Sequence, residues 1–309
     1  MANSMVQVGG WHGVKVGVAK RLRVVRWRSK NFDRVLRHQF GDRRDRGLQP
    51  MLDELRREGI ITRPLSAVFS LKSQSVFADA TILARQLWDQ ARAALERGEL
   101  GDGSAYEGKE YKAQLLPRQL SAESPFLQLA LDPNLLQLAN RYLRMRACLR
   151  EVNVWWDRPT STPAKETQLW HRDGDDVMNV KVFVLFNDVD LAAGPFCFAS
   201  QTHPLGRRRD LAPERDPTLR RTTDEQMARV LPPSAWTIYT GLAGTVVVCD
   251  TCGFHKGQKP IRKDRLMMIM HYTSGTCRYP RMFELVGTPT HPWTGAQRDA
   301  LRPYGRFES

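Results

Sequence analysis

A histidine and three aspartates crowd into the stretch "HRDGDD", directly before the alternating apolar run "NVKVFVLF". Acidic side chains repel one another and hydrate well, so the cluster is either a solvated loop or a metal site. In an extended segment, residues two apart point to the same side with a repeat of about 6.6 Å, so His171 and Asp173 can close on one ion. The best third ligand is His255, because it follows the strand-like "GTVVVCD" and can lie on a neighbouring strand. Two histidines and one carboxylate leave three octahedral positions open, which favours non-haem Fe(II) and oxygen chemistry.

An arginine ten residues after His255 sharpens this interpretation. Arg265 opens the apolar run "RLMMIMHYTS". A 2-oxoglutarate cosubstrate that chelates iron through its keto-acid end leaves a distal carboxylate, which a fixed and always-charged arginine can bind through two hydrogen bonds. Arg262 is the competing candidate. We favour Arg265 because alternate residues of the strand that it opens should face the interior; the other interpretation is a solvated charge at a strand end.

The composition describes the protein that must position these residues. The chain has 309 residues, 41% of them apolar and 26% charged, which is typical of a soluble globular protein. No apolar run is long enough for a transmembrane helix, and no secretory signal begins the chain. The five cysteines do not resemble a disulfide framework, so a reducing, cytoplasmic location is expected. Cys249 and Cys252 form a CxxC pair, interpreted as buried thiols because no second pair completes a zinc site and the motif follows a strand.

Positive charge is concentrated at the N-terminus. Residues 1–47 hold twelve Lys or Arg and three Asp, within a net charge of +14. Such a segment can bind nucleic acid, an anionic membrane surface or another polyanion, or it can be a solvated, flexible extension. No RNA-recognition or zinc-finger pattern accompanies it. Its Arg-rich, acid-poor character also leaves mitochondrial targeting open.

The remaining elements indicate an α+β fold. "LQPMLDELRREGIITRPL" reads as a short helix followed by a strand at residues 60–62, and "ADATILARQLWDQARAALERGEL" as a helix with Ile82, Leu83, Leu87, Ala91, Ala94 and Leu95 at helical spacing. A further helix should start behind Asp132 and Pro133. From Cys148 onward, "ACLREVNVWW", "NVKVFVLFND", "GPFCFAS", "SAWTIYTG", "GTVVVCD" and "RLMMIMHYTS" read as short strands. Short strands behind a helical layer favour a β-sandwich or jelly roll flanked by N-terminal helices.

These segments together resemble the phytanoyl-CoA dioxygenase family. The resemblance covers roughly residues 50–285, through "QLWHRDGDDVMNVKVFVLFNDVDLAAGPFCFASQTH", "GTVVVCDTCGFHKG" and "RLMMIMHYTS". It implies a cupin-like double-stranded β-helix, an Fe(2+) site at His171, Asp173 and His255, 2-oxoglutarate held by Arg265 and flanked by Phe183, and O2 as the third reactant. "FASQTH" departs from the family's Pro-Gly-Ser/Thr-His turn, which leaves the turn shape and any role of His203 open. Because Asp173 is present, hydroxylation or related oxidation is expected rather than halogenation.

The expected organisation follows from these elements. It comprises a basic extension over residues 1–47, an oxygenase domain over residues 48–285 and a C-terminal extension over residues 286–309. Within the domain, residues 48–145 form the helical layer and residues 146–275 the jelly-roll core.

Several further side chains are weaker candidates. Lys181 shares a strand face with Phe183, and it either reaches into the barrel to meet an anionic group or extends outward at the rim. Gln168, on a strand entering the metal loop, is a candidate hydrogen-bond donor to cosubstrate or substrate. Trp156, Arg158 and Asp175 are candidate substrate contacts, although Asp175 and Asp176 are also expected to shape the loop. His271 is expected to be a packed strand histidine.

We therefore predict an Fe(II)/2-oxoglutarate-dependent dioxygenase that oxidises a small organic or acyl-type substrate and releases succinate and CO2. The alternatives are a non-catalytic jelly roll that keeps the site for a metal or ligand, and an oxygenase tethered to a polyanion by its basic N-terminus. The sequence specifies neither the substrate nor the oligomeric state. An insert containing Arg207, Arg208, Arg209, Arg220 and Arg221 suits either an anionic substrate or a solvated lid.

Overall fold

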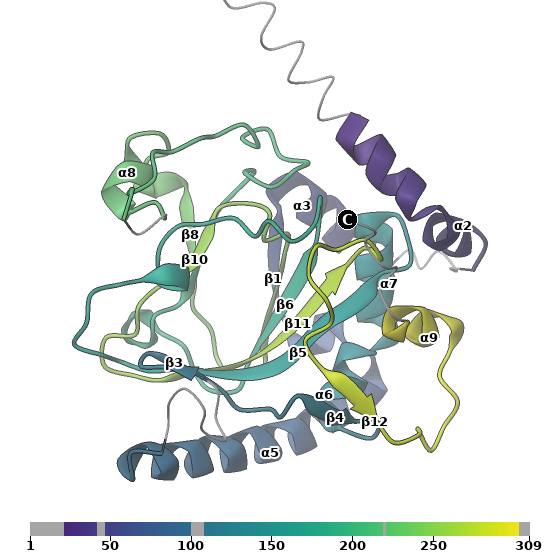
Figure 1. Ribbon diagram of the computed structural model, residues 1–309, viewed down its shortest axis with the longest axis horizontal. Helices are drawn as coiled ribbons and strands as arrows, with labels where there is room; N and C mark the ends of the chain where they lie inside the picture. Colours follow the sequence, from purple (N-terminus) through teal and green to yellow (C-terminus); the bar gives the residue numbers. More distant parts are fainter. Residues whose placement is uncertain (1–21, 42–46, 100–107, 219–220, 303–309) are drawn as a thin grey trace, which may run out of the picture.

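Two antiparallel β-sheets form the centre of the protein, which is described by a computed structural model over residues 22–41, 47–99, 108–218 and 221–302 (Figure 1). The larger sheet has the strand order β1 (Ile60–Pro64), β9 (Thr245–Cys249), β6 (Val180–Leu185), β11 (Arg265–Thr273), β5 (Cys148–Asp157), β3 (Lys112–Gln114) and β2 (Gly108–Lys109). The smaller sheet has the order β10 (His255–Gly257), β7 (Phe196–Ala199) and β8 (Trp236–Tyr239). A short parallel pair joins β4 (Gln119–Ser121) to β12 (Glu284–Val286).

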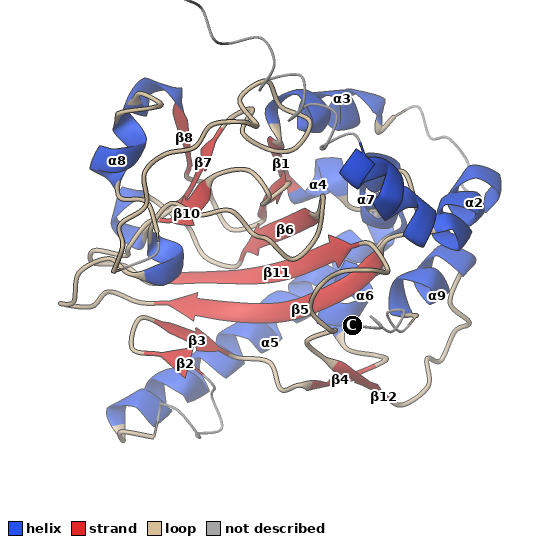
Figure 2. Ribbon diagram, turned by 45° about the horizontal axis from the view of Figure 1, so that its top comes forward, coloured by secondary structure: helices blue, strands red, loops and turns tan. Residues whose placement is uncertain are grey.

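Helices cover one face of the larger sheet, and the smaller sheet covers the other. Figure 2 shows α5 and α6 behind the long strands β5 and β11. The helices are α2 (Phe32–Gly41), α3 (Gln49–Glu58), α4 (Leu65–Val68), α5 (Leu71–Glu96), α6 (Pro125–Ala130), α7 (Pro133–Leu143), α8 (Asp224–Ala228) and α9 (Gly295–Leu301), with 3-10 turns at Glu166–Gln168, Leu191–Ala193 and Pro233–Ala235. The α+β layering expected from the sequence is therefore present.

The alternation of side chains along β6 separates two cores. Val180, Val182 and Val184 pack in the cluster shared with the helices. Phe183 and Leu185 pack in a second cluster that contains residues of both sheets. This arrangement follows from the period of two along a strand, and it confirms the expected division of β6 into two faces.

The longest helix begins earlier than its apolar residues indicate and buries most of the face that they define. Ser70 caps α5, because its hydroxyl accepts a hydrogen bond from the backbone of Ser73. Small side chains, such as Ala80 and Ala84, form its fully buried stripe. Of the six residues expected at helical spacing, Ala91 and Ala94 are buried and Leu83 and Leu87 pack against the core, whereas Ile82 and Leu95 are exposed. Alanines permit close packing of helix against sheet, which long side chains would prevent.

The start of α7 matches the expectation from Asp132 and Pro133. The Asp132 carboxylate accepts hydrogen bonds from the backbone N–H groups of Asn134 and Leu135. Pro133 occupies the first helical turn, where its missing N–H costs nothing.

Part of the basic N-terminal segment packs on the body of the protein. Residues 22–30 and α2 are helical, and the Trp27 indole donates to Asp176 (2.6 Å) and to Ser274 (3.0 Å). The expected boundary at residue 47 therefore does not separate these helices from the domain, while residues 1–21 and 42–46 lie outside the described residues. At the other end, β12 and α9 are ordered elements of the fold, and Asp299 of α9 pairs with Arg146 (3.8 Å). No helix within the described residues combines the length and the apolarity needed to cross a membrane.

Candidate metal centre

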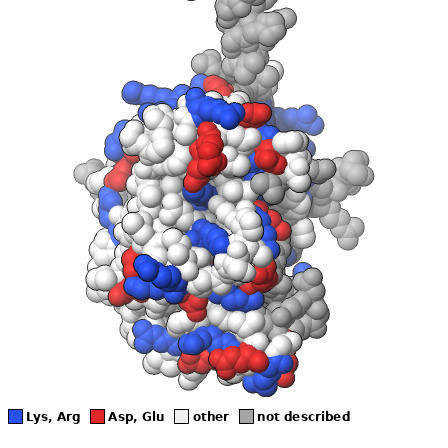
Figure 3. Space-filling model, turned by 90° about the vertical axis from the view of Figure 1, so that its left-hand side faces the viewer, with Lys and Arg blue, Asp and Glu red and all other residues white. Residues whose placement is uncertain are grey.

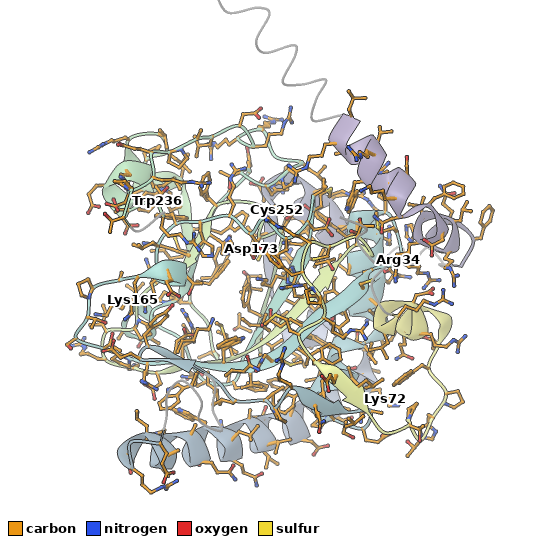
Figure 4. All side chains as sticks on the ribbon, in the orientation of Figure 1. Arg34, Lys72, Lys165, Asp173, Trp236 and Cys252 are labelled. Atoms are coloured by element: carbon orange, nitrogen blue, oxygen red, sulfur yellow. The ribbon has the colours of Figure 1, made fainter. Side chains whose placement is uncertain are left out.

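Backbone hydrogen bonds bring the HxD segment beside β10. His171 and His255 exchange two backbone hydrogen bonds, of 3.0 and 2.9 Å, and the N–H of Asp173 donates to the carbonyl of Thr251 (2.8 Å). Asp173 consequently lies in the interior, between the strands of the two sheets, whereas Lys165 and Lys72 lie at the periphery (Figure 4). The three side chains proposed from the sequence as ligands meet, with their ligand atoms all within 4.8 Å of one another.

Each histidine presents a free nitrogen to the carboxylate. The Nδ1 atoms lie close to backbone carbonyls, at 2.8 Å from Leu169 for His171 and 3.0 Å from Gly253 for His255. Those contacts assign the proton to Nδ1, so the Nε2 lone pairs remain for a ligand. Both Nε2 atoms lie 3.9 Å from Oδ1 of Asp173. A carbonyl partner of this kind behind each ring is the usual support of a metal-ligating histidine, because it fixes the tautomer and the ring orientation.

A buried lysine holds the other carboxylate oxygen. Lys181 Nζ donates to Oδ2 of Asp173 at 2.7 Å, so Lys181 points into the protein rather than out at its rim. Burial opposes the charge on both groups. The positive charge of Lys181 nevertheless keeps the pKa of Asp173 well below its usual value, and the carboxylate raises the pKa of Lys181 in turn. The pair is therefore a charged, desolvated ion pair.

Burial also keeps the two histidines neutral. Loss of hydration, reinforced by the neighbouring His171, lowers the pKa of His255 to about 3. Burial lowers the pKa of His171 as well, against the opposing influence of Asp173. Neutral imidazole and ionised carboxylate are the forms that bind a metal ion, so at neutral pH the triad needs to lose no proton before binding.

The triad lies in the wall of a cavity that opens to solvent. Its apolar wall is formed by Phe183, Phe196, Met267 and Ile269. The rings of Phe183 and Phe196 pack with their centroids 4.8 Å apart. Phe183 therefore lies in the wall of the same cavity as the triad.

Arg265 lines the same cavity and is almost fully buried. Its Nη2 pairs with Asp157 Oδ2 at 3.1 Å, across the register of β11 and β5, while its Nη1 has no hydrogen-bond partner among the described residues. A side chain at Gly257 would put its Cβ only 2.8 Å from Nη2, which explains a glycine at this close approach. The competing Arg262 is exposed on a bend before the strand.

Besides Asp157, two polar residues of the cavity wall were not found from the sequence. Lys112 on β3 lies opposite Asp157, with its Nζ 4.0 Å from the centroid of the Trp155 ring. Burial lowers its pKa. Thr167 is the second. A strand of three residues has too little periodicity to be recognised, and no motif marks either position.

Four other candidates lie outside the cavity wall. Trp156 was expected to contact the substrate, and the structure corrects this. Trp156 lies on the helix-facing side of β5, in the core shared with the helices, and its neighbour Trp155 faces the interior instead. Arg158, two residues after Trp156, lies on the same side as Trp156. Its guanidinium stacks over the Trp156 ring, 5.1 Å from the centroid. Asp175 pairs with Arg150 (3.3 Å) rather than facing the cavity.

Gln168 is the fourth candidate outside the cavity wall, and it does not lie on a strand as expected. It ends a 3-10 turn, where its side-chain oxygen accepts a hydrogen bond from the backbone of Lys165. The turn directs the neighbouring Thr167 to the cavity in its place.

Two further buried histidines, His203 and His271, have structural surroundings. His271 is fully buried on β11, as expected of a packed strand residue, with its Nδ1 3.3 Å from Arg150. His203 is buried with its Nε2 3.0 Å from the carbonyl of Arg56. In the turn before it, Gln201 adopts the left-handed conformation with φ of 68°, which a glycine adopts more readily.

The CxxC loop behind the triad contains a second buried carboxylate. Cys249 and Cys252 are buried free thiols, as expected. Asp250 between them accepts hydrogen bonds from Tyr142 (2.8 Å) and from the backbone of Cys252 (3.0 Å). Burial outweighs these hydrogen bonds and raises the pKa of Asp250 to about 7.

This raised pKa predicts a pH-dependent loss of stability. The folded protein holds a proton on Asp250 that the unfolded chain releases near its ordinary pKa, so the free energy of unfolding falls as pH rises from about 4 to 7. The Asp250→Asn variant has no ionisable group at this position. Between these two pH values, we expect the free energy of unfolding of this variant to fall by about 2–3 kcal/mol less than that of wild type. Urea unfolding of both proteins at several pH values measures the difference. Parallel pH curves would contradict a titrating Asp250.

Lys256, a buried lysine next to His255, connects β10 to the insert that contains α8. Lys256 Nζ donates to both oxygens of Asp224 at 2.6 and 2.7 Å, and the Trp170 indole donates to the same carboxylate (2.7 Å). Trp170 packs against Trp236 in the cluster beneath the insert. Asp224 therefore connects α8 to residues adjacent to both histidines of the triad.

We expect Asp224→Ala to lower the free energy of unfolding by about 1–3 kcal/mol, because it removes the acceptor of the buried Lys256 charge and of the Trp170 N–H. The half-exposed position of Asp224 keeps the effect below that of a fully buried pair. Urea unfolding checks the magnitude, and limited proteolysis checks loosening of the insert. Glu225→Ala is the matched control, since its side chain is exposed one residue further along the same helix. An equal, small effect of both changes would exclude this anchoring role.

Four of the five insert arginines lie in the described residues, and of these Arg221 is partly buried and the other three are exposed. Arg207, Arg208 and Arg209 lie on the surface, and the carbonyl of Arg209 accepts a hydrogen bond from Arg172 (3.0 Å). Arg220 lies outside the described residues. On the face shown in Figure 3, Lys and Arg alternate with Asp and Glu and form no continuous basic field among the described residues.

No protein-family model and no curated protein matches the chain. Among solved structures, AviO1 from Streptomyces viridochromogenes Tue57 is 18% identical with a TM-score of 0.48, covering 76% of this chain and 98% of that one. The epimerase SnoN, solved with Fe3+, alpha ketoglutarate and nogalamycin RO, is 18% identical with a TM-score of 0.48, covering 80% and 93%. EctD from S. alaskensis with bound Fe is 17% identical with a TM-score of 0.47, covering 83% and 85%. Similarity of this extent assigns neither ligand nor reaction to this chain, so the chemistry rests on its own side chains.

Proposed function

We propose that this chain is an iron(II)- and 2-oxoglutarate-dependent oxygenase, and that its two facing sheets form a double-stranded β-helix of the phytanoyl-CoA dioxygenase type. The observation that carries the proposal is the convergence of His171, Asp173 and His255, with both Nε2 atoms directed at one carboxylate oxygen and both Nδ1 atoms fixed by carbonyls. The backbone bridge between His171 and His255 holds the two imidazoles side by side and so produces this convergence.

The donor set fits iron. Two imidazoles and one carboxylate on one side of an ion leave positions for a bidentate cosubstrate and for O2. Asp173 has one oxygen held by Lys181, which leaves Oδ1 as its ligand atom. A zinc ion tolerates the same donors, so metal preference is a part of the test.

Arg265 fits the distal carboxylate of 2-oxoglutarate. Its buried Nη1 lacks an acceptor among the described residues, and a buried donor without a partner is costly unless a ligand supplies one. Asp157 holds the other edge of the guanidinium in place. Lys112, in the same wall, adds positive charge beside an anionic cosubstrate.

The protein side of the reaction is positioning and exclusion of water. Bound iron, with 2-oxoglutarate and O2, supplies the oxidising chemistry, with succinate and CO2 as co-products. His171, Asp173 and His255 orient the metal, Arg265 orients the cosubstrate, and the apolar wall described above keeps water from the reacting groups. We propose a small organic substrate and hydroxylation or a related oxidation as the outcome.

The test is an anaerobic optical titration of the metal-free protein with Fe(II) and 2-oxoglutarate. We expect a weak visible charge-transfer band from iron chelated by the keto acid. Arg265→Ala should require at least about tenfold more 2-oxoglutarate, because a charge-assisted bidentate contact is lost. Arg262→Ala is the matched control and should titrate as wild type, since Arg262 is exposed.

The outcomes separate the proposal from its rival. Bound iron without the band would favour a non-catalytic metal-binding protein. An equal effect of the Arg262 and Arg265 changes would remove Arg265 from the cosubstrate site. A band followed by succinate release on admitting O2 would support the oxygenase.

A further inference from the structure

The helices at residues 22–41 are attached to the body by polar contacts on one side. Trp27 donates to Asp176 and Ser274, Asn31 accepts from the backbone of Gly275, and Arg34 donates to the carbonyl of Asp299 (3.0 Å). These three side chains are nearly fully buried and recur at helical spacing. The inner side of the segment is therefore fixed in orientation, at the edge of the molecule near α7 and α9 (Figure 1).

The opposite side exposes large apolar residues. Leu22 and Val25 are 62% and 61% exposed, Phe32 is 61% exposed and Phe40 is 86% exposed. We call these four residues the N-terminal apolar face. An ordinary surface helix buries its apolar side chains against the body. Here the body is contacted through Trp27, Val35 and polar groups, which leaves the four residues of the N-terminal apolar face exposed and without a partner among the described residues.

Positive charge surrounds this face. Residues 22–41 contain six Lys or Arg and one acidic residue, Asp33, which lies 4.0 Å from Arg37. Arg23, Arg26 and Arg37 are exposed on the same helices. Exposed apolar side chains interspersed with cations are the composition of helices that lie in the interface of an anionic membrane.

We propose that the N-terminal apolar face docks on an anionic phospholipid surface. The cations attract the lipid headgroups, and the two phenylalanines, with Leu22 and Val25, enter the boundary between headgroups and acyl chains. Nucleic acid fits less well, because the aliphatic Leu22 and Val25 neither stack on bases nor bind phosphate. A second copy also fits less well, because each chain carries a net charge of +14 and the two basic faces would repel.

The experiment is co-sedimentation of the full chain with vesicles of phosphatidylcholine, with and without phosphatidylglycerol. We expect binding only to the anionic vesicles, weakened by high salt. Phe32→Ser/Phe40→Ser should bind about tenfold more weakly or worse, because each lost phenylalanine removes buried apolar area. Leu71→Ser/Ile261→Ser is the matched control: both side chains are exposed, at 84% and 68%, on other parts of the surface.

Three results would overturn the proposal. Equal vesicle binding by the phenylalanine variant and wild type would mean that the N-terminal apolar face does not enter the lipid. Binding to single-stranded DNA, but not to vesicles, with sensitivity to the same changes would assign the face to nucleic acid. Self-association seen by light scattering and lost in the phenylalanine variant, without vesicle binding, would assign it to a second copy.

Discussion

His255→Ala is expected to weaken iron(II) binding by on the order of 100-fold or more, because it removes one of three converging ligands and leaves the metal held by one loop. Within the proposed triad, His255 comes from β10, whereas His171 and Asp173 come from the same short segment. Its Nδ1 is already engaged by the carbonyl of Gly253, so the ligand atom that the ring offers is Nε2. Anaerobic titration of the metal-free protein, followed by metal analysis of the equilibrated complex, gives the dissociation constant.

This variant isolates metal binding better than a change at Asp173. Loss of Asp173 would also leave the buried Lys181 charge without its partner, and the resulting loss of stability would lower metal binding indirectly. His291→Ala provides the control, because His291 is an exposed histidine far along the chain. Equal iron affinity of the two variants would refute the proposed triad. Iron affinity lost only in His255→Ala, with unchanged thermal unfolding of the metal-free protein, would support it.

Local patterns in the sequence identified the parts of the fold that depend on neighbours along the chain. The two faces of β6 followed from alternation, and the start of α7 followed from Asp132 before Pro133. His171 and Asp173 were paired for the same reason, since residues two apart in an extended segment share a side.

The errors arose where burial depends on contacts across the fold. On β5 nearly every residue is buried, so alternation defines two faces without showing which one meets the cavity; Trp156 was therefore assigned to the wrong face. The helix at α5 was recognised, but Ile82 and Leu95 of its expected apolar face are exposed, while the buried Ala80 and Ala84 were not identified. The Trp27 indole donates a hydrogen bond to Asp176, which is 149 residues away in the sequence. No local pattern in the basic segment indicates this contact.

Lys181 shows most clearly what a linear pattern leaves open. From the sequence, a lysine in an apolar strand can extend to solvent or turn inward, and the two directions have opposite chemical meanings. The partner that decides between them, Asp173, lies on a different element, although only eight residues away. The direction becomes predictable once the metal loop is placed over the inner face of β6.

Lys181→Met is expected to lower the free energy of unfolding of the metal-free protein by about 3–5 kcal/mol, because Asp173 is left as a buried charge without its partner. Iron should recover more stability in this variant than in wild type, since the ion neutralises Asp173 and no longer faces the positive Lys181. Urea unfolding with and without Fe(II) under anaerobic conditions measures both quantities.

The double variant Lys181→Met/Asp173→Asn separates the ion pair from simple packing. Removing both charges should cost less than removing Lys181 alone, because the desolvation of an unpaired carboxylate disappears together with the carboxylate. The double variant should also lose the additional stabilisation by iron, since a neutral amide is a weaker ligand than the carboxylate that it replaces. Costs that add across the two positions would show that Lys181 and Asp173 do not interact energetically. In that case the short Lys181–Asp173 contact would not be what holds Oδ2 away from the metal, and the single free oxygen of Asp173 would need another cause.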